Sequence, residues 1–190
     1  MVDSKQQLKL FQQPKLKRAH GGSLAVSKRR ARRPLNMKQS HHVTMKSHHA
    51  VGARSLFRHK KMILILIKKN SLKFHIKIYE YAIQGNHIHL LVKAQNREEL
   101  QNFFRVIAGH IAQGILRECP IKGAPGGASV KPTGCQKNQR KFWSYLLYSR
   151  IVSWGREFKI VLGYIQRNTL ELLQVMAYQP PQKGRQSNSG

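Results

Sequence analysis

The sequence predicts an α+β fold in which helices cover one face of an antiparallel sheet. Residues 73–83 alternate between apolar and polar side chains, which is typical of a strand because successive strand residues point to opposite faces. From Leu100 to Ile115, apolar residues recur every three or four positions instead, which is typical of an amphipathic helix. A chain of 190 residues is long enough for one domain of this kind with tails.

The first half of the predicted domain contains three strands and one helix. We expect a strand at 42–45, a helix at 55–70, the alternating strand at 73–83 and another strand at 87–93. Gln84-Gly85 is a turn signal, so the last two strands should form a hairpin.

The second half adds helix, strand and helix. Asn96 and Glu99 have the spacing of a capping box, so a helix should start after Asn96 and end by Pro120. A strand at 142–153 and a last helix at about 155–175 follow. The order strand, helix, strand, strand, helix, strand is that of a ferredoxin-like sandwich, here with one trailing helix.

Three segments lie outside this pattern. Residues 1–40 are basic and poor in apolar side chains, so we expect a disordered arm, either simply solvated or lying along phosphates. The Gly-, Pro- and Lys-rich segment 120–140 is predicted to be a mobile loop. Residues 177–190 are predicted to be a disordered tail, which leaves 41–176 as the domain.

The charge points to a polyanionic partner. Lys and Arg number 35 against 7 Asp and Glu, a formal net charge of +28, which favours nucleic acid first and an acidic membrane surface second. No stretch reaches the roughly 20 apolar residues that span a bilayer, and the longest run, 62–67, is flanked by lysines. We therefore expect a cytoplasmic, nucleoid-associated protein with no membrane partner.

Two small groups of residues could carry chemistry. His87 and His89 are two apart in a predicted strand, so both imidazoles should share one face, as half of a metal site or as two ordinary exposed histidines. Tyr164 and Asn168 are four apart on the last helix and should be neighbours, although a tyrosine there could equally be packing at the edge of the core.

These groups resemble motifs of known transposases. The run from Tyr81 to Val92, which includes Asn86-His-Ile-His-Leu-Leu91, resembles the HUH segment of the single-tyrosine (IS200-like) transposases, especially the REP-associated tyrosine transposases. The segment Gly163-Tyr-Ile-Gln-Arg-Asn168 resembles their nucleophile helix, usually written Tyr-Ile-x-x-Asn-Pro. Two departures are Gln84-Gly85, where the family commonly has Met-Pro, and Thr169, where it commonly has Pro.

The resemblance implies a metal-dependent endonuclease and strand transferase acting on single-stranded or hairpin DNA. His87, His89 and Asn168 would hold one Mg²⁺ or Mn²⁺, and Tyr164 would be the nucleophile that forms a 5′-phosphotyrosine linkage. The family includes both monomers and homodimers, so either state is open. The basic residues that we expect to contact DNA phosphates are Lys73, Lys77, Lys93, Arg105, Arg140, Lys141 and Arg150.

Two other interpretations remain. A non-catalytic basic nucleic-acid-binding protein on the same sandwich would explain the charge and the sheet, but not the two histidines followed by a Tyr-x-x-x-Asn helix. A decayed transposase that only binds DNA would explain all of these features, so the sequence leaves catalytic activity as an expectation.

Overall fold

A five-stranded sheet of order β1-β5-β2-β4-β3 forms the centre of the computed structural model, which describes residues 18–28, 31–120 and 141–173. All neighbouring strands are antiparallel. The strands are β1 (Ala19–His20), β2 (Ser40–Lys46), β3 (Lys77–Ile83), β4 (His87–Lys93) and β5 (Tyr148–Val152). Without β1, the order β5-β2-β4-β3 is the ferredoxin-like arrangement that the succession of elements predicts, so the predicted α+β fold is confirmed.

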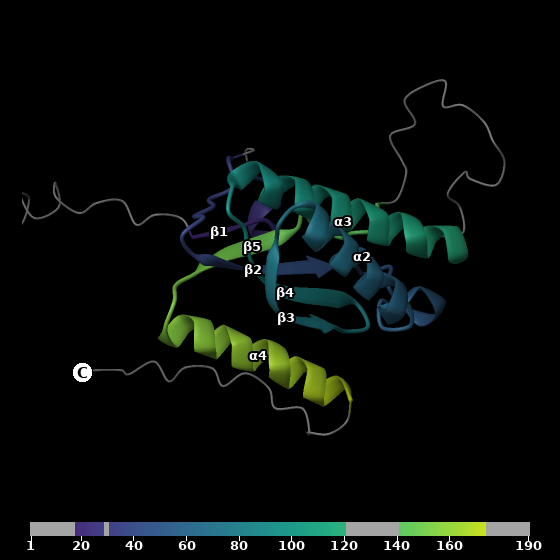
Figure 1. The fold of residues 1–190 in the computed structure, drawn as a ribbon. Coiled ribbons are helices and arrows are strands. Elements are labelled where there is room, and N and C mark those ends of the chain that lie inside the picture. Colours follow the sequence, from purple (N-terminus) through teal and green to yellow (C-terminus); the bar gives the residue numbers. More distant parts are fainter. Residues whose placement is uncertain (1–17, 29–30, 121–140, 174–190) are drawn as a thin grey trace, which may run out of the picture.

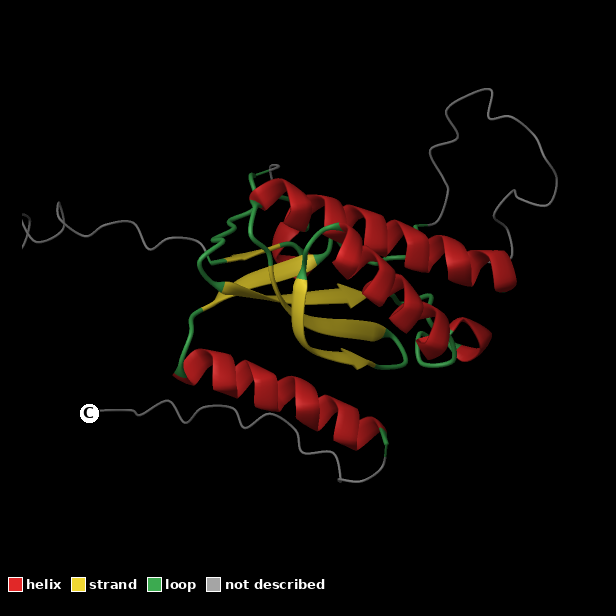
Figure 2. Cartoon of the chain, viewed as in Figure 1, coloured by secondary structure: helices red, strands yellow, loops and turns green. Residues whose placement is uncertain are grey.

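Helices cover both faces of this sheet (Figures 1 and 2). One face carries α2 (Lys60–Lys73) and α3 (Arg97–Glu118), and the other carries α4 (Arg156–Leu172). Two short 3₁₀ helices, η1 (Gly22–Ala25) and η2 (Gly52–Arg54), precede β2 and α2 respectively. No helix in the described ranges is long and apolar enough to span a bilayer.

The alternation of strand side chains separates two cores. Val43 and Met45 of β2, together with Ile88 and Leu90 of β4, are fully or almost fully buried in the larger core beneath α2 and α3. On the other face a smaller core beneath α4 contains the buried side chains Ala82, Leu91, Val152, Val161 and Ile165. His87, His89 and Lys93, which share the parity of Leu91 in β4, therefore face α4, as do His42 and Thr44, which lie opposite Leu91 and His89 in β2.

The helix α3 begins as predicted. The Asn96 side chain accepts a hydrogen bond from the Glu99 backbone N–H at 2.8 Å, which caps one of the free donors at the helix start. The buried positions Leu100, Phe104, Ile107, Ile111 and Ile115 have the periodicity read from the sequence, so this stripe lies in the larger core.

The helix α2 and the strand β3 meet later than expected. The helix extends to Lys73, and the strand begins only at Lys77. His75 between them has a φ of 50°, and the Ile76 N–H bonds the Ser71 carbonyl at 2.9 Å, which closes a turn. Phe74 and Ile76 pack into the larger core from this turn, so their apparent strand alternation has a different cause.

The strand β5 is shorter than the predicted 142–153. Before Tyr148 the chain packs against α3, where the Trp143 indole N–H donates to the Ala108 carbonyl at 2.8 Å. Phe142 is buried in the larger core, and the Ser144 N–H bonds the Lys46 carbonyl at 3.0 Å. The aromatic residues that suggested a strand thus contribute to the core as an irregular segment.

Part of the expected arm lies against the sheet. β1 pairs with the edge strand β5, and the Arg33 guanidinium donates to the Ser149 hydroxyl at 2.6 Å. The expectation of disorder throughout residues 1–40 therefore does not hold for 18–28 and 31–40. Residues 1–17, almost all of the predicted loop 120–140 and the predicted tail 177–190 lie outside the described residues.

Candidate active site

The two histidines of β4 share the sheet face that α4 covers. Their ring centroids are 4.8 Å apart and their planes are nearly perpendicular, at 88°. His89 is buried, whereas His87, at the start of the strand, is partly exposed. This is the common face that the spacing of His87 and His89 predicts.

Hydrogen bonding occupies the same nitrogen in both rings. The His87 Nδ1 lies 2.6 Å from Asn86 Oδ1, an oxygen that can only accept, so Nδ1 donates. The His89 Nδ1 lies 3.1 Å from two atoms of β2, Thr44 Oγ1 and His42 Nε2. The His89 Nε2 is buried and has no hydrogen-bond partner among the described residues.

Burial keeps these rings neutral at neutral pH. It lowers the pKa of His89 to about 3, with smaller contributions from His42 and His87, and it also lowers the pKa of His87, with a smaller contribution from Lys46. The pKa of His42 falls to about 4 through burial and then through the nearby Arg150. Neutral imidazoles retain the lone pair that a metal ion requires.

Tyr164 lies over the histidines because α4 is amphipathic. Val161 and Ile165 enter the smaller core, and Tyr164, at 48% exposure, stands at the edge of that stripe. Its ring lies edge-on to His89, with 5.5 Å between centroids, and 6.2 Å from the ring of His42. The structure therefore brings the Tyr164 ring beside the two-histidine strand.

Asn168 follows Tyr164 by one turn and is buried, at 8% exposure. Its amide Nδ2 has no hydrogen-bond partner in the described part of the chain. A hydrogen bond of 3.1 Å from Gln166 Nε2 to Glu80 Oε2 ties the same helix segment to β3. An amide N–H without an acceptor can donate to an oxygen of a bound anion such as a phosphate, whereas the Oδ1 of the same amide is the atom that could ligate a cation.

The other tyrosines of the described ranges are less well placed. A register shift between Ile78 and Glu80 leaves Tyr79 on the α4 face, whereas Tyr81 pairs with Leu90 and faces the opposite side. Tyr79 packs on Trp154 and Phe158, and burial raises its pKa. Tyr145 contacts the His48 ring, Tyr148 packs against Gly22, and Tyr178 lies outside the described residues.

Two neighbours of the site, His42 and Thr44, were not predicted from the sequence. The adjacent histidines of β2 point to opposite faces, as neighbouring residues of a strand do. His41 therefore lies on the side of the larger core, while the ring of His42 stacks on that of His89, with 5.2 Å between centroids and 22° between planes. The ferredoxin-like order places the first strand beside the third, and the two-residue spacing of His42 and Thr44 fits one face. Only the register, which the sequence does not give, brings both to His89.

The described residues contain no cluster of three or more His, Cys, Asp or Glu side chains arranged for a metal ion. Among the described residues, a further ligand beside the two histidines would therefore be of another kind, such as an amide oxygen. The free Nε2 of buried His89 is an unpartnered ligand atom, and the residue types of His87, His89 and Asn168 suit a divalent ion in an open site.

The basic residues predicted to contact DNA divide between the two faces. Lys77 and Lys93 lie opposite each other on β3 and β4, on the α4 face. Their ammonium groups lie over the rings of Tyr79 and Trp154 respectively. Arg150 lies opposite His42 on β5 and forms an ion pair of 3.3 Å with Glu157. Lys73 ends α2 on the other side of the sheet, and Arg140 lies outside the described residues.

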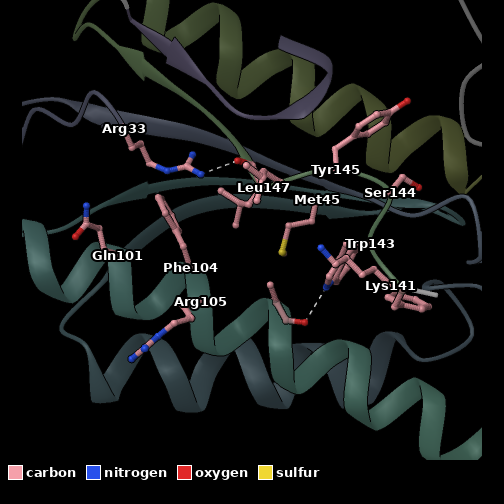
Figure 3. A pocket seen from close by; sticks show the side chains of 13 residues that line it. Arg33, Met45, Gln101, Phe104, Arg105, Lys141, Trp143, Ser144, Tyr145 and Leu147 are labelled. Atoms are coloured by element: carbon pink, nitrogen blue, oxygen red, sulfur yellow. Dashed lines mark hydrogen bonds between the residues drawn. The ribbon is translucent and has the colours of Figure 1, made fainter. Parts of the chain in front are cut away.

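The remaining two, Arg105 and Lys141, line a pocket between α3 and residues 141–147 (Figure 3). The pocket has a volume of about 710 Å³ and combines these cations and Arg33 with Phe104, Trp143 and Tyr145. Arg33 donates to the Leu147 carbonyl at 2.8 Å, and burial lowers its pKa. Met45 and Phe104 belong to the larger core, so the pocket opens on the α3 side of the sheet and away from Tyr164.

Comparison with known proteins agrees with this geometry. Residues 40–130 match the family described as "Transposase IS200 like", and no curated protein matches significantly. The structure resembles that of a REP-associated tyrosine transposase bound to a REP hairpin, with 13% identity, a TM-score of 0.52 and coverage of 76% of this chain and 74% of that one.

A proposed transposase from Deinococcus radiodurans R1 is also similar, with 11% identity over 74% of this chain and 98% of that one, but its TM-score of 0.40 is too low to support a conclusion. The solved REP-associated structure supports the fold, and the family match covers the two-histidine strand. The resemblance to the IS200-like transposases is thereby confirmed over residues 40–130, which contain the two-histidine strand, whereas the segment of Tyr164 lies outside the matched residues.

Proposed function

We propose that this chain is a metal-dependent single-stranded DNA endonuclease and strand transferase that works in DNA transposition through a 5′-phosphotyrosine intermediate. The observation that carries the proposal is the placement of the Tyr164 ring 5.5 Å from the ring of His89, over a strand whose two histidines face it. The family match supports a DNA-processing enzyme, and the site supplies the residue types for the finer assignment.

His87, His89 and Asn168 are the proposed ligands of one Mg²⁺ or Mn²⁺ ion. Both histidines use Nδ1 in hydrogen bonds, which leaves Nε2 of each ring for the ion. When bound, the ion would polarise the scissile phosphate and offset the charge that develops on it.

Tyr164 is the proposed nucleophile. Its hydroxyl oxygen forms a bond to phosphorus, and the bond from phosphorus to the 3′ oxygen breaks. The phenol proton is released, the 3′ oxygen takes up a proton, and the products are a 5′-phosphotyrosine and a free 3′-OH. Attack on that linkage by the same or another 3′-OH re-forms a phosphodiester, so no nucleotide cofactor is needed.

Single-stranded or hairpin DNA is the proposed substrate. On the α4 face, Lys77, Lys93 and Arg150 lie on the same side of the sheet as the histidines, where they can contact the phosphates of the strand being cut. Trp154, at 40% exposure, lies beside Lys93 and offers a ring for base stacking. The pocket of Arg105 and Lys141 would contact another part of the DNA on the opposite face.

A monomer is sufficient for this chemistry, since one chain supplies both the histidine strand and the helix of Tyr164. A homodimer remains compatible with the same site. We expect the protein to act on nucleoid DNA in the cytoplasm.

The alternative of a binding-only protein, whether a decayed transposase or another basic protein, is disfavoured by a buried polar atom. An unsatisfied buried polar group costs about 1–3 kcal/mol, so a His89 Nε2 with no partner is unfavourable in a site that binds no ion.

The test is cleavage of hairpin DNA with a single-stranded flank, with and without Mn²⁺, followed by denaturing electrophoresis. A labelled DNA fragment that is covalently attached to the protein only when Mn²⁺ is present supports the proposal. Binding of the hairpin with no cleavage at any Mn²⁺ or Mg²⁺ concentration identifies a binding-only protein. Cleavage that is unaffected by EDTA would refute the metal-dependent mechanism.

A further inference from the structure

The inner ring nitrogen of His89 faces two polar atoms from a neighbouring strand. Thr44 lies directly opposite His89 in the β2–β4 register, and its Oγ1 is 3.1 Å from His89 Nδ1. His42, two residues earlier on the same face, places its Nε2 at the same distance and stacks its ring on that of His89. Both residues lie outside the set assigned to metal binding or nucleophilic attack.

The arrangement distinguishes between the two neutral forms of the His89 ring. A neutral imidazole carries its proton on either Nδ1 or Nε2. With the proton on Nδ1, the ring donates to Thr44 Oγ1 or His42 Nε2, and Nε2 holds a lone pair. With the proton on Nε2, the ring has a buried donor for which the described residues offer no acceptor.

We propose that His42 and Thr44 are positioning residues that keep the proton of His89 on Nδ1 and fix the ring, so that its Nε2 lone pair faces the ion. The inference rests on the proposed function, in which His89 is a metal ligand. Hydrogen-bonded partners of this kind orient ligating histidines and raise their affinity for metal.

The ring of His87 also carries its proton on Nδ1, but it donates to a different partner. Its Nδ1 donates to the side chain of Asn86, the preceding residue on the chain. His89 cannot use a neighbour in its own strand because Ile88 and Leu90 point into the larger core. The acceptors for His89 therefore come from β2, and two are present where one would suffice.

This redundancy makes a specific prediction for variants. Thr44→Val removes the hydroxyl at nearly constant shape, and His42→Phe removes the ring nitrogens but keeps a ring to stack on His89. Either change leaves one acceptor, so we expect small losses of Mn²⁺ affinity from each. The double variant should lose about 10- to 100-fold, more than the two single losses combined.

The decisive measurement is the protonation of His89 in metal-free protein, read from ¹⁵N chemical shifts of its imidazole with His89→Gln used to assign the signal. We expect a protonated Nδ1 and an unprotonated Nε2 in the wild type. In the double variant the preference should be lost. Thr44→Ser in the His42→Phe background retains a hydroxyl, so it should retain the wild-type protonation and match the affinity of the His42→Phe single variant.

Mn²⁺ affinity is measured by calorimetry on the same proteins, with His110→Gln as a control for losing an exposed histidine of α3. Denaturant unfolding establishes that each variant is folded. A wild-type His89 with the proton on Nε2, or a double variant that matches the wild type in protonation and affinity, would overturn the inference. A wild type that binds no Mn²⁺ would instead overturn the proposed function, while the ¹⁵N shifts still decide the role of His42 and Thr44.

Discussion

The ring of Tyr164 stands edge-on to the ring of His89, at an interplanar angle of 81° and with 5.5 Å between centroids. One residue comes from the last helix and the other from a central strand, 75 positions apart in the chain. The contact therefore depends on how α4 docks on the sheet.

Tyr164→Phe should abolish the covalent protein–DNA adduct, because the substitution removes only the attacking oxygen. The exposed position of Tyr164 means that the free energy of unfolding and the affinity for DNA should change little. The adduct is measured with labelled single-stranded DNA and Mn²⁺. Tyr79→Phe is the matched control on the same sheet face, and an adduct that disappears in that variant but persists without the Tyr164 hydroxyl would contradict the assignment.

Asn168→Leu should stabilise the metal-free protein by about 1 kcal/mol, because it removes a buried amide with an unsatisfied Nδ2. The same variant should lose most of the increase in Tm that Mn²⁺ produces in the wild type. Asn70→Leu is the control: Asn70 is also buried but donates to the Leu66 carbonyl at 2.8 Å, so that variant should be destabilised and keep the Mn²⁺ response. An undiminished response in Asn168→Leu would remove Asn168 from the proposed ligands.

The stability of the fold should fall as the pH is lowered from 6.5 towards 4. His41 is fully buried, and burial, together with Arg33, lowers its pKa to about 4, whereas the unfolded chain has the ordinary value of 6.5. Below pH 6.5 the unfolded state therefore takes up a proton that the folded state resists, and stability is lost by up to about 3 kcal/mol for this residue alone. His42 and His89 act in the same direction.

Urea unfolding at several pH values between 7.5 and 4.5 measures this effect. His41→Gln keeps an acceptor for the Asn36 N–H but cannot titrate, so its free energy of unfolding should depend less steeply on pH. Equal slopes for the two proteins would show that His41 does not contribute.

Removing residues 1–17 should reduce the salt dependence of DNA binding while leaving the site intact. The segment contributes Lys5, Lys9, Lys15 and Lys17, and the slope of log K against log salt falls by about 0.7–0.9 for each phosphate that the protein no longer neutralises. A larger deletion through residue 40 would also remove β1 and Arg33, which lie against β5, so it tests the fold as well. A full-length variant with the four lysines changed to Gln should match the deletion, and an unchanged slope in both would show that the segment does not contact DNA.

Arg105→Gln combined with Lys141→Gln should weaken hairpin binding without slowing cleavage at saturating DNA. Both residues line the pocket on the α3 side, away from Tyr164. Binding is followed by fluorescence anisotropy and cleavage by single-turnover kinetics. Lys68→Gln, on an exposed position of α2, is the control for loss of charge elsewhere, and a slower cleavage step at saturation would place the pocket in the chemistry instead.

Long periodic elements of this fold are predictable from the sequence, whereas the junctions between elements are not. α3 shows both its cap at Asn96 and its apolar stripe, and β4 shows the alternation that places His87 and His89 together. The start of β3 differs from the prediction because Phe74 and Ile76 lie in the turn before the strand. Their apolar side chains pack into the larger core from that turn. The one-residue bulge after Ile78 then places Tyr79 and Tyr81 on opposite faces, whereas regular strand alternation predicts that residues two apart share a face.

The candidate site divides in the same way. Residue spacing within one element predicts the pairs His87–His89 and Tyr164–Asn168, because strand and helix geometry is fixed locally. The contribution of His42 and Thr44 depends on the register between β2 and β4, which is set by side-chain packing across the whole sheet.

The two cores of this protein differ in size, and that difference bears on motion. Five buried side chains under α4 form a cluster of their own, whereas α2 and α3 share the larger core with most of the sheet. We therefore expect α4 to behave as a separate cooperative unit in hydrogen exchange, with amides that exchange through a local opening of lower free energy than global unfolding. Such an opening would carry the Tyr164 hydroxyl away from the sheet while the two histidines stay in place, which gives a covalently held DNA end a route from one 3′-OH to another.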